Sequence, residues 1–222
     1  MLRRLLLAAV VCLLSGLLPR PLALAGEPRD GLARALDFTV TLEGDGRYGA
    51  GVLADPQAGL VVTALHVVDG MHAPRATFHD GTQAPAHLLA SDRALDLALL
   101  SVPPTRGEKP RLGDPARLRP GDELYAIGCP RRLPFSVARG IVSYVGRVID
   151  GVRWLQTDLP INVGDSGGPV VDAQGEWLGM TSFVLREGQG LSFALPVDEI
   201  AHRFARRLAL GPRSATAAPH RR

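Results

Sequence analysis

The chain has 222 residues, of which 46% are hydrophobic and 21% charged, and it contains 25 glycines and 18 prolines. This composition excludes an intrinsically disordered chain, and the lack of a strict glycine period excludes a fibrous repeat. The length suits one all-β domain or two small domains with a sizeable core. The formal net charge of +3 suggests an acidic partner, until the N-terminus is considered separately.

The N-terminal residues 1–25 have the layout of a secretory signal peptide. Residues 1–4 form a short basic start, residues 5–18 are mostly apolar, and residues 23–25 give the small-residue pattern that precedes cleavage. The apolar stretch is shorter than the roughly 20 residues of a membrane span. We therefore expect an exported chain whose mature form does not contact a membrane, with an uncleaved membrane anchor as the alternative.

The basic character of the chain belongs to this N-terminal segment. Cleavage after Ala25 would remove Arg3, Arg4 and Arg20, which leaves 22 basic residues against the 22 acidic ones. A neutral chain without a basic patch is not expected to bind nucleic acid. Cys129 would be the one remaining cysteine, so an intramolecular disulfide is impossible, and no Cys or His spacing fits a zinc site. We expect no metal and no organic cofactor.

The mature chain consists mostly of short predicted strands separated by turns. Asp80-Gly81 is a hairpin signal between two of them, and residues 103–119 are rich in proline, glycine and charge, as in a linker between two halves. Such regular short strands favour a barrel or a sandwich. The strand candidates are 38–42, 48–53, 60–63, 75–79, 83–89 and 95–102, then 123–127, 135–145, 153–157, 169–171, 177–183 and 191–195.

One helix is predicted over about 197–209. Its apolar positions, from Val197 through Ile200 and Phe204 to Leu208, recur with helical spacing. Acidic residues in its first turn and arginines near its end match the helix dipole. Gly211-Pro212 then stops the helix, and residues 213–222 are expected to form a flexible tail.

The segment Gly164-Asp165-Ser166-Gly167-Gly168-Pro169 points most directly to chemistry. A serine hydroxyl becomes a nucleophile when a base takes its proton, and backbone N–H groups must then bind the resulting oxyanion. Glycines beside the serine permit a tight turn and close approach to a substrate. Gly164 and Ser166 could supply the two N–H donors of such an oxyanion hole. A plain surface turn is the alternative for so short a motif.

Two further segments could supply the partners of this serine. His66 follows one apolar run, and Asp96 begins another. A carboxylate on the far nitrogen of a histidine fixes the tautomer that a general base needs. The chain order His66, Asp96, Ser166 is that of chymotrypsin-like enzymes. Asp92 is an alternative acid, although no apolar strand follows it directly.

Taken together, these segments resemble the trypsin-like serine proteases, and within them the bacterial HtrA/Deg family. The resemblance implies an all-β fold of two antiparallel six-stranded barrels, over about 36–110 and 118–196, with the C-terminal helix completing a protease domain over 26–212. It implies that His66 and Asp96 lie in the first barrel and Ser166 in the second. It rests on the order and spacing of segments 49–53, 63–70, 96–100, 126–128, 140–143, 156–158, 161–166 and 190–196.

The chain departs from the family pattern in two ways. Few residues follow the helix, so the PDZ domains usual in the HtrA family are not expected, and Asp165 stands where that family usually has Asn. Digestive trypsins also have Asp at this position, paired with an N-terminal amine released by cleavage. No activation sequence of that kind is present, so we expect Asp165 to be solvated or satisfied by another donor.

The resemblance also bears on the specificity pocket. Trypsin has Asp six residues before its serine, whereas this chain has Pro160, so cleavage after Arg or Lys is not expected. Ile161 and Phe183 are implied as pocket walls, and the Phe183 ring would favour a small apolar residue before the cleaved bond. The alternative is that Phe183 points into the barrel core.

The leading hypothesis is an exported serine endopeptidase that acts on unfolded polypeptides through an acyl-enzyme, in the periplasm or outside a bacterium. The second hypothesis is a non-proteolytic binding or scaffold module on a protease fold. The third is an α/β-hydrolase esterase whose nucleophile elbow is Gly164–Gly168, which would need a histidine after the serine. The short segment before the first strand favours a monomer.

Overall fold

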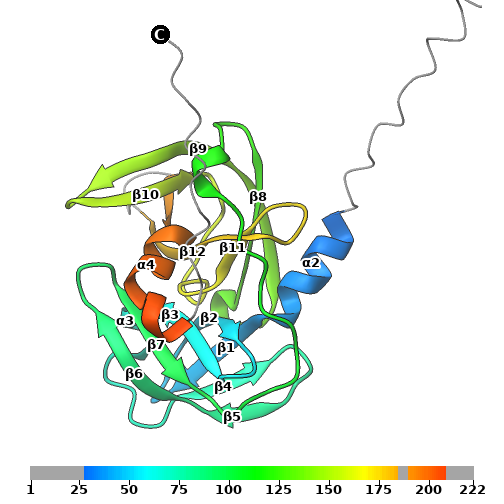
Figure 1. The fold of residues 1–222 in the computed structure, drawn as a ribbon, viewed down its shortest axis with the longest axis vertical. Helices are drawn as coiled ribbons and strands as arrows, with labels where there is room; N and C mark the ends of the chain where they lie inside the picture. The colour runs from blue at the N-terminus through cyan, green and yellow to red at the C-terminus, as the bar shows by residue number, and fades with distance from the viewer. Residues whose placement is uncertain (1–27, 185–189, 209–222) are drawn as a thin grey trace, which may run out of the picture.

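The computed structural model describes residues 28–184 and 190–208 (Figure 1). The expected signal peptide over 1–25 and the expected tail over 213–222 lie outside these residues. The elements are, in chain order, α2 (Pro28–Asp37), β1 (Thr39–Gly44), β2 (Arg47–Asp55), β3 (Leu60–Ala64), α3 (Leu65–Val68), β4 (Arg75–Phe78), β5 (Gln83–Pro85), β6 (His87–Asp92), β7 (Leu97–Ser101), the 3-10 turn η1 (Pro115–Arg117), β8 (Glu123–Gly128), the 3-10 turn η2 (Pro130–Arg132), β9 (Ser136–Ile149), β10 (Val152–Thr157), β11 (Pro169–Val171), β12 (Trp177–Val184), β13 (Ser192–Pro196) and α4 (Val197–Leu208).

Strands β1 to β7 form one antiparallel sheet with the strand order β5-β4-β1-β2-β3-β7-β6. Its two edge strands, β5 and β6, are neighbours in the chain, and Ala86 alone separates them. The run 83–92 therefore pairs first with β4 and then with β7, so it draws the two edges of the sheet toward each other as a half barrel. The sequence predicted a single strand over 83–89. The structure divides that strand because its pairing passes from one edge to the other.

Strands β8 to β13 form a closed antiparallel barrel with the order β10-β13-β12-β11-β8-β9. Successive side chains of strand β8 point to opposite faces of the sheet. Leu124 and Ala126 belong to the core of this barrel, whereas Tyr125 and Ile127 belong to the core shared with the first sheet. The predicted all-β class with a chymotrypsin-like double barrel and a following helix is confirmed. The second barrel has the six strands predicted, whereas the first is a half-barrel sheet of seven strands, because the run 83–92 is divided into two. The α/β-hydrolase hypothesis is wrong, since this fold lacks the alternation of strands and helices that it needs.

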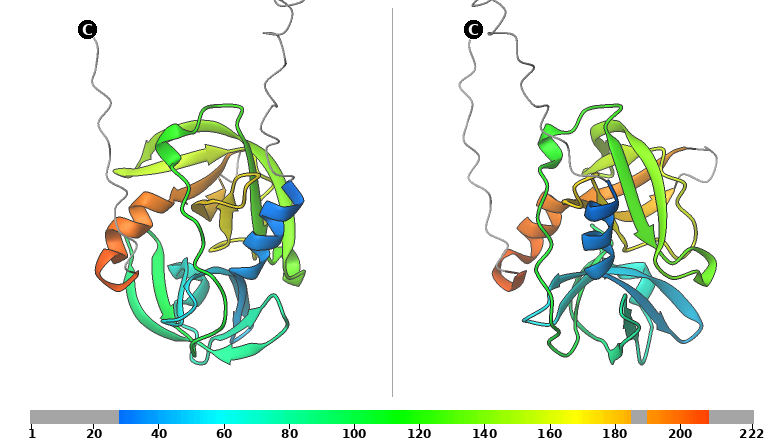
Figure 2. Two further views of the ribbon diagram at one scale, coloured as in Figure 1. Left: turned by 45° about the vertical axis from the view of Figure 1, so that its right-hand side comes forward. Right: turned by 90° about the vertical axis from the view of Figure 1, so that its right-hand side faces the viewer.

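Helix α4 spans Val197–Leu208, as its apolar spacing predicts, and it joins the two barrels. In both views of Figure 2 it leaves the second barrel and ends beside the first sheet. An ion pair of 2.6 Å links Arg203 Nε to Asp92 Oδ2 on β6. At the other end, Arg153 Nη2 on β10 lies 2.7 Å from Glu199 Oε1. The helix is thus tied to one strand of each barrel.

Helix α2, over Pro28–Asp37, was not predicted from the sequence. Its Gly31 fits tightly against the second barrel, because a Cβ there would lie 2.2 Å from the Ala173 carbonyl oxygen. Arg34 on the same helix donates from Nη2 to the Gln174 carbonyl at 2.9 Å. A glycine that weakens the local helical signal is therefore what allows this helix to dock.

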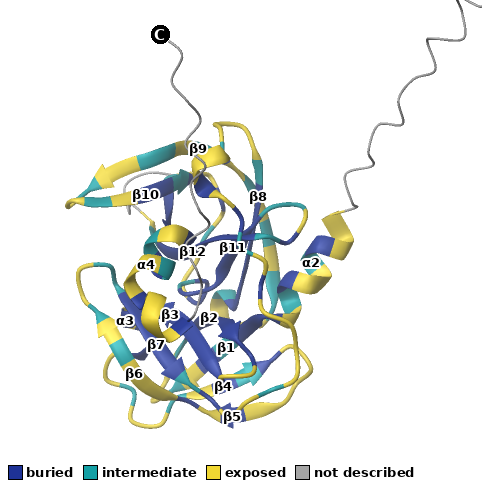
Figure 3. Cartoon of the chain, viewed as in Figure 1, coloured by how far each residue is buried: buried dark blue, intermediate teal, exposed yellow. Residues whose placement is uncertain are grey.

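The buried side chains form one cluster that extends from the first barrel to α4, and a smaller cluster fills the second barrel. Figure 3 shows the resulting burial along β3, β7 and β12. Because the first cluster contains Leu97 of β7, Met180 of β12 and Phe204 of α4, the barrels share one core. Within residues 28–184 and 190–208, no helix is long and apolar enough to cross a membrane.

Candidate active site

His66 and Asp96 are brought together at one end of the first barrel. His66 lies in the short helix α3 that follows β3, and Asp96 directly precedes β7. Asp96 Oδ1 accepts the His66 backbone N–H at 2.9 Å, and Asp96 Oδ2 lies 2.5 Å from His66 Nδ1. The Asp96 carbonyl also accepts the N–H of Leu65 at 2.9 Å. The carboxylate therefore fixes the imidazole ring and leaves its Nε2 free to serve as a base.

Asp96 has a φ of 49°, which is uncommon for a residue other than glycine. Strands β6 and β7, which precede and follow it, and its hydrogen bonds to Leu65 and His66 of α3 hold Asp96 in this conformation. Asp92, the alternative acid, instead accepts the N–H of Leu95 at 3.0 Å and pairs with Arg203 of α4. The structure thus places Asp96 against His66 and Asp92 against the helix.

Ser166 lies on the loop between β10 and β11, and both barrels hold that loop. The Ser166 carbonyl accepts the Ala50 N–H of β2 at 2.9 Å, and the next residue, Gly167, donates its N–H to Thr181 of β12 at 2.8 Å. The Ser166 hydroxyl donates to the Ser182 carbonyl at 3.3 Å. Within the described residues, no hydrogen bond joins this hydroxyl to His66. At 3.3 Å the bond to Ser182 is long for an O–H donor, so it opposes rotation of the hydroxyl only weakly.

Two backbone N–H groups beside the nucleophile have no acceptor among the described residues, those of Gly164 and Ser166. The Val163 carbonyl accepts the N–H of Arg131 at 3.0 Å, and the Gly164 carbonyl accepts the N–H of Cys129 at 3.1 Å. Because a trans peptide points its C=O and N–H in opposite directions, the first of these bonds turns the Gly164 N–H away from Arg131. These are the two donors that the sequence motif predicts for an oxyanion hole.

Gly164 has a φ of +105°, which a side chain would strain. A Cβ at this position would also lie 2.1 Å from the Cys129 carbonyl oxygen and 2.6 Å from Cε2 of Tyr48. The backbone of residues 163–166, called the oxyanion loop for its proposed role, is therefore packed directly against residues of both barrels.

Asp165 is buried, with 5% of its surface exposed. Its Oδ2 accepts the N–H of Asn162 at 2.8 Å, so a backbone donor of the same loop satisfies it, as one of the two alternatives predicts. No cation of the described residues pairs with it. Burial raises the pKa of Asp165 to about 6, and the Asn162 hydrogen bond opposes this shift. Cys129 is buried as a free thiol nearby, and burial raises its pKa as well.

The three residues proposed for the specificity pocket have different surroundings. Pro160 is exposed, and its carbonyl accepts a hydrogen bond from Asn162 Nδ2 at 3.1 Å. Ile161 is half-buried against the core of the second barrel. The Phe183 ring stacks on Phe193 with centroids 4.8 Å apart and meets the edge of Trp154 at 4.9 Å. The sequence did not reveal this aromatic cluster, because it depends on the pairing of β10, β12 and β13.

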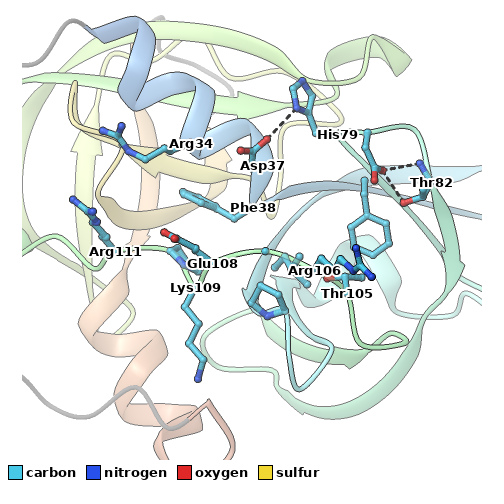
Figure 4. Close-up of a pocket in the computed structure, with 17 residues that line it drawn as sticks. Arg34, Asp37, Phe38, His79, Thr82, Thr105, Arg106, Glu108, Lys109 and Arg111 are labelled. Atoms are coloured by element: carbon cyan, nitrogen blue, oxygen red, sulfur yellow. Dashed lines mark hydrogen bonds and ion pairs between the residues drawn. The ribbon is translucent and has the colours of Figure 1, made fainter.

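A separate cavity of about 610 Å³ lies between α2, the turn after β4 and the linker before β8 (Figure 4). Its lining includes Arg34, Arg106 and Lys109, together with Asp37 and other residues of both charges, but none of His66, Asp96 or Ser166. On its rim Asp37 Oδ1 lies 3.5 Å from His79 Nδ1. This cavity therefore has no part in the chemistry of the serine loop. The described residues also hold no cluster of three or more ionisable side chains that fits a metal ion.

Two antiparallel barrels with a His–Asp pair on one and a glycine-flanked serine on the other define a trypsin-like peptidase fold. A family model described as "Trypsin-like peptidase domain" matches residues 49–180, and the chain belongs to this family.

The curated relatives and the solved structures are of the HtrA type. "Serine protease Do-like HtrA" of Bacillus subtilis is 34% identical over 167 residues, which cover 68% of this chain and 37% of that protein. "Probable periplasmic serine endoprotease DegP-like" of Halomonas elongata is 38% identical over 146 residues, covering 63% of this chain and 31% of that protein. The chain thus spans well under two thirds of the length of these relatives.

Among solved structures, the HtrA-type protease AlgW with a tripeptide superposes with a TM-score of 0.76 at 29% identity. The match covers 83% of this chain and 64% of the AlgW chain. The resemblance noted from the sequence is therefore confirmed for the family and for the fold.

Proposed function

We propose that this chain is an exported serine endopeptidase that hydrolyses peptide bonds through an acyl-enzyme. The observation that carries the proposal is the contact of 2.5 Å between His66 Nδ1 and Asp96 Oδ2. The Ser166 loop lies close to α3, because a Cβ on Gly49 would lie 2.6 Å from Val67 Cγ1 and 3.2 Å from the Ser166 carbonyl oxygen. Acyl transfer needs a histidine oriented by a carboxylate, a serine, and two N–H groups free to bind an oxyanion. The Gly164 and Ser166 N–H groups have no acceptor among the described residues.

Each part has one task in the proposed reaction. The Ser166 hydroxyl leaves the Ser182 carbonyl, gives its proton to His66 Nε2 and attacks the peptide carbonyl carbon. The N–H groups of Gly164 and Ser166 bind the oxyanion. His66 then protonates the leaving amine, and water attacks the acyl-enzyme by the same route in reverse. Asp96 keeps its charge throughout and stabilises the imidazolium.

The proposed substrates are unfolded polypeptides, and the proposed location is the periplasm. The AlgW structure contains a tripeptide, and several relatives are named periplasmic serine endoproteases. We further propose a preference for small apolar residues before the cleaved bond, with Pro160, Ile161 and Phe183 contributing to the pocket.

Labelling with a fluorophosphonate probe tests the proposal, using wild-type chain 26–222, Ser166→Ala and His66→Ala side by side. We expect labelling of the wild-type chain alone, and degradation of casein that Ser166→Ala lowers by several orders of magnitude. Equal casein degradation by wild type and Ser166→Ala would contradict the proposal. A folded but unlabelled wild-type chain that binds denatured protein without cutting it would instead support the binding-module alternative.

A further inference from the structure

The segment from Cys129 to Phe135 connects β8 to β9 and holds the oxyanion loop in place. Its backbone supplies the two N–H groups that bind the Val163 and Gly164 carbonyls, from Arg131 and Cys129. The same segment contains three residues with positive φ, at 50° for Arg131, 66° for Arg132 and 58° for Phe135. None of them is glycine, so the backbone is strained and persists only where other contacts hold it.

The side chain of Arg132 supplies such contacts, and all of them reach the first barrel. Nη1 lies 2.6 Å from Glu43 Oε1, and Nη2 donates to the Gly46 carbonyl at 2.8 Å. The guanidinium also lies over the ring of Tyr48, 4.5 Å from its centroid. An exposed ion pair alone contributes little. Here one planar group makes three contacts with the β1–β2 hairpin, which suits the rigid fork of arginine.

Tyr48 links Arg132 to the oxyanion loop, because its ring contacts both. Its ring packs where a Cβ of Gly164 would lie, at 2.6 Å from Cε2. Arg132 therefore touches the ring that backs Gly164, and it also fixes the backbone segment that orients the Val163–Gly164 peptide.

We infer that Arg132 is a positioning residue that clamps the 129–135 segment to the β1–β2 hairpin and so keeps the Gly164 N–H turned toward the oxyanion. This inference rests on the proposed function for its effect on rate, and on geometry alone for its effect on the loop. Without the clamp, the strained segment relaxes, the Arg131 N–H releases the Val163 carbonyl, and the Val163–Gly164 peptide can rotate. One of the two oxyanion donors is then lost.

The test uses Arg132→Ala, because alanine loses the three guanidinium contacts but, like arginine, keeps the strain of a φ of +66°. We expect kcat on a peptide substrate to fall by roughly 10- to 100-fold with little change in KM, since oxyanion bonds strengthen in the transition state. The inhibition constant of a peptide boronate, which resembles that state, should rise in proportion. Glu43→Ala should give a similar loss, and the double variant should lose no more than either single one.

Arg139→Ala is the matched control. Arg139 Nε lies 2.9 Å from Glu123 Oε2, so this ion pair is also exposed, but it joins β9 to β8 within one barrel. This variant should keep wild-type kcat. A kcat of Arg132→Ala within about twofold of wild type, or a loss confined to KM, would overturn the inference.

A second measurement needs no catalytic activity. Hydrogen exchange at the Cys129 and Arg131 amides should quicken in Glu43→Ala, whose substitution is distant from both in sequence, and should stay unchanged in Arg139→Ala. If these two amides exchange no faster in Glu43→Ala than in wild type, the inference that Arg132 clamps the segment is overturned, even if the chain proves inactive. A wild-type chain that exchanges as expected but never reacts at Ser166 would refute the proposed function alone.

Discussion

Asp96 makes three contacts with α3, and through them it would orient His66 as the proposed base. Its carboxylate binds both the backbone N–H and the ring Nδ1 of His66, while its carbonyl binds Leu65. The sequence predicted His66, Asp96 and Ser166 because each follows or precedes a recognisable apolar run or glycine motif. It could not predict that the Ser166 hydroxyl points to Ser182, because a side-chain rotamer depends on neighbours that only the folded chain brings near.

Asp96→Asn tests the orienting role. An amide can still accept the His66 backbone N–H, but its NH2 group faces Nδ1 and forces the other tautomer, which leaves Nε2 protonated and useless as a base. We expect kcat to fall roughly 10⁴-fold with the thermal midpoint little changed. Steady-state kinetics at pH 8 and thermal unfolding measure both. A loss below tenfold would mean that Asp96 does not orient the base.

Asp165→Asn tests whether the buried charge of Asp165 lowers the stability of the folded chain. Folding raises the pKa of Asp165 from 3.8 to about 6, so the folded state binds this proton more tightly than the unfolded state. The wild-type chain therefore loses stability through this group as pH rises from about 4 to about 6, by on the order of 3 kcal/mol in total. Asparagine keeps an oxygen for the Asn162 N–H and has no charge to bury.

We therefore expect Asp165→Asn to be more stable than wild type at pH 8, and to lose most of that advantage at pH 4. Urea unfolding of both chains at the two pH values gives the difference, in which the contributions of all other carboxyl groups cancel. An advantage that is the same at pH 4 and pH 8 would show that the Asp165 charge is not the cause.

Among the elements, α4 and the strands of the second barrel follow their sequence patterns closely, whereas α2 does not. The spacing of Val197, Ile200, Phe204 and Leu208 made α4 predictable because a helix face repeats within the sequence. Helix α2 has a glycine in its middle, and its packing partner lies far along the chain, at Ala173 and Gln174. Local patterns cannot reveal a contact of that range.

Gly31→Ala tests the docking of α2. In an exposed helix this change stabilises by about 1 kcal/mol. Here the added Cβ would lie 2.2 Å from the Ala173 carbonyl oxygen, so we expect the free energy of unfolding to fall instead, by roughly 1–3 kcal/mol as for other overpacked sites. Arg29→Ala, at an exposed position of the same helix, should be nearly neutral. A stabilised Gly31→Ala variant would mean that α2 does not dock.

At the scale of the whole molecule, the proposed active site is divided between two barrels that share a core. His66 and Asp96 belong to the first and Ser166 to the second, and α4 contributes Phe204 and Leu208 to the shared cluster. The division could be predicted from the family resemblance. The part that α4 plays in joining the barrels could not, because it depends on contacts of Arg203 and Arg153 with distant strands.

Phe204→Ala tests that junction. Phe204 is 5% exposed, so its truncation should lower the free energy of unfolding by about 3–5 kcal/mol. Because the triad spans both barrels, fluorophosphonate labelling should disappear at the same urea concentration as tertiary structure, in the variant and in wild type. Arg206→Ala, exposed on the same helix, should change stability by less than about 0.5 kcal/mol. Labelling that outlasts the tertiary signal would show that the barrels assemble the site without α4.

Helix α4 follows every strand of the described residues, and this order has a consequence for biogenesis. In a polypeptide made from its N-terminus, the proposed base His66 emerges first, the proposed nucleophile Ser166 later, and α4 after both. Until that helix has emerged, the halves lack its contacts with Asp92 and Arg153. If the proposed triad needs these contacts, a chain still in transit cannot cleave its own unfolded segments.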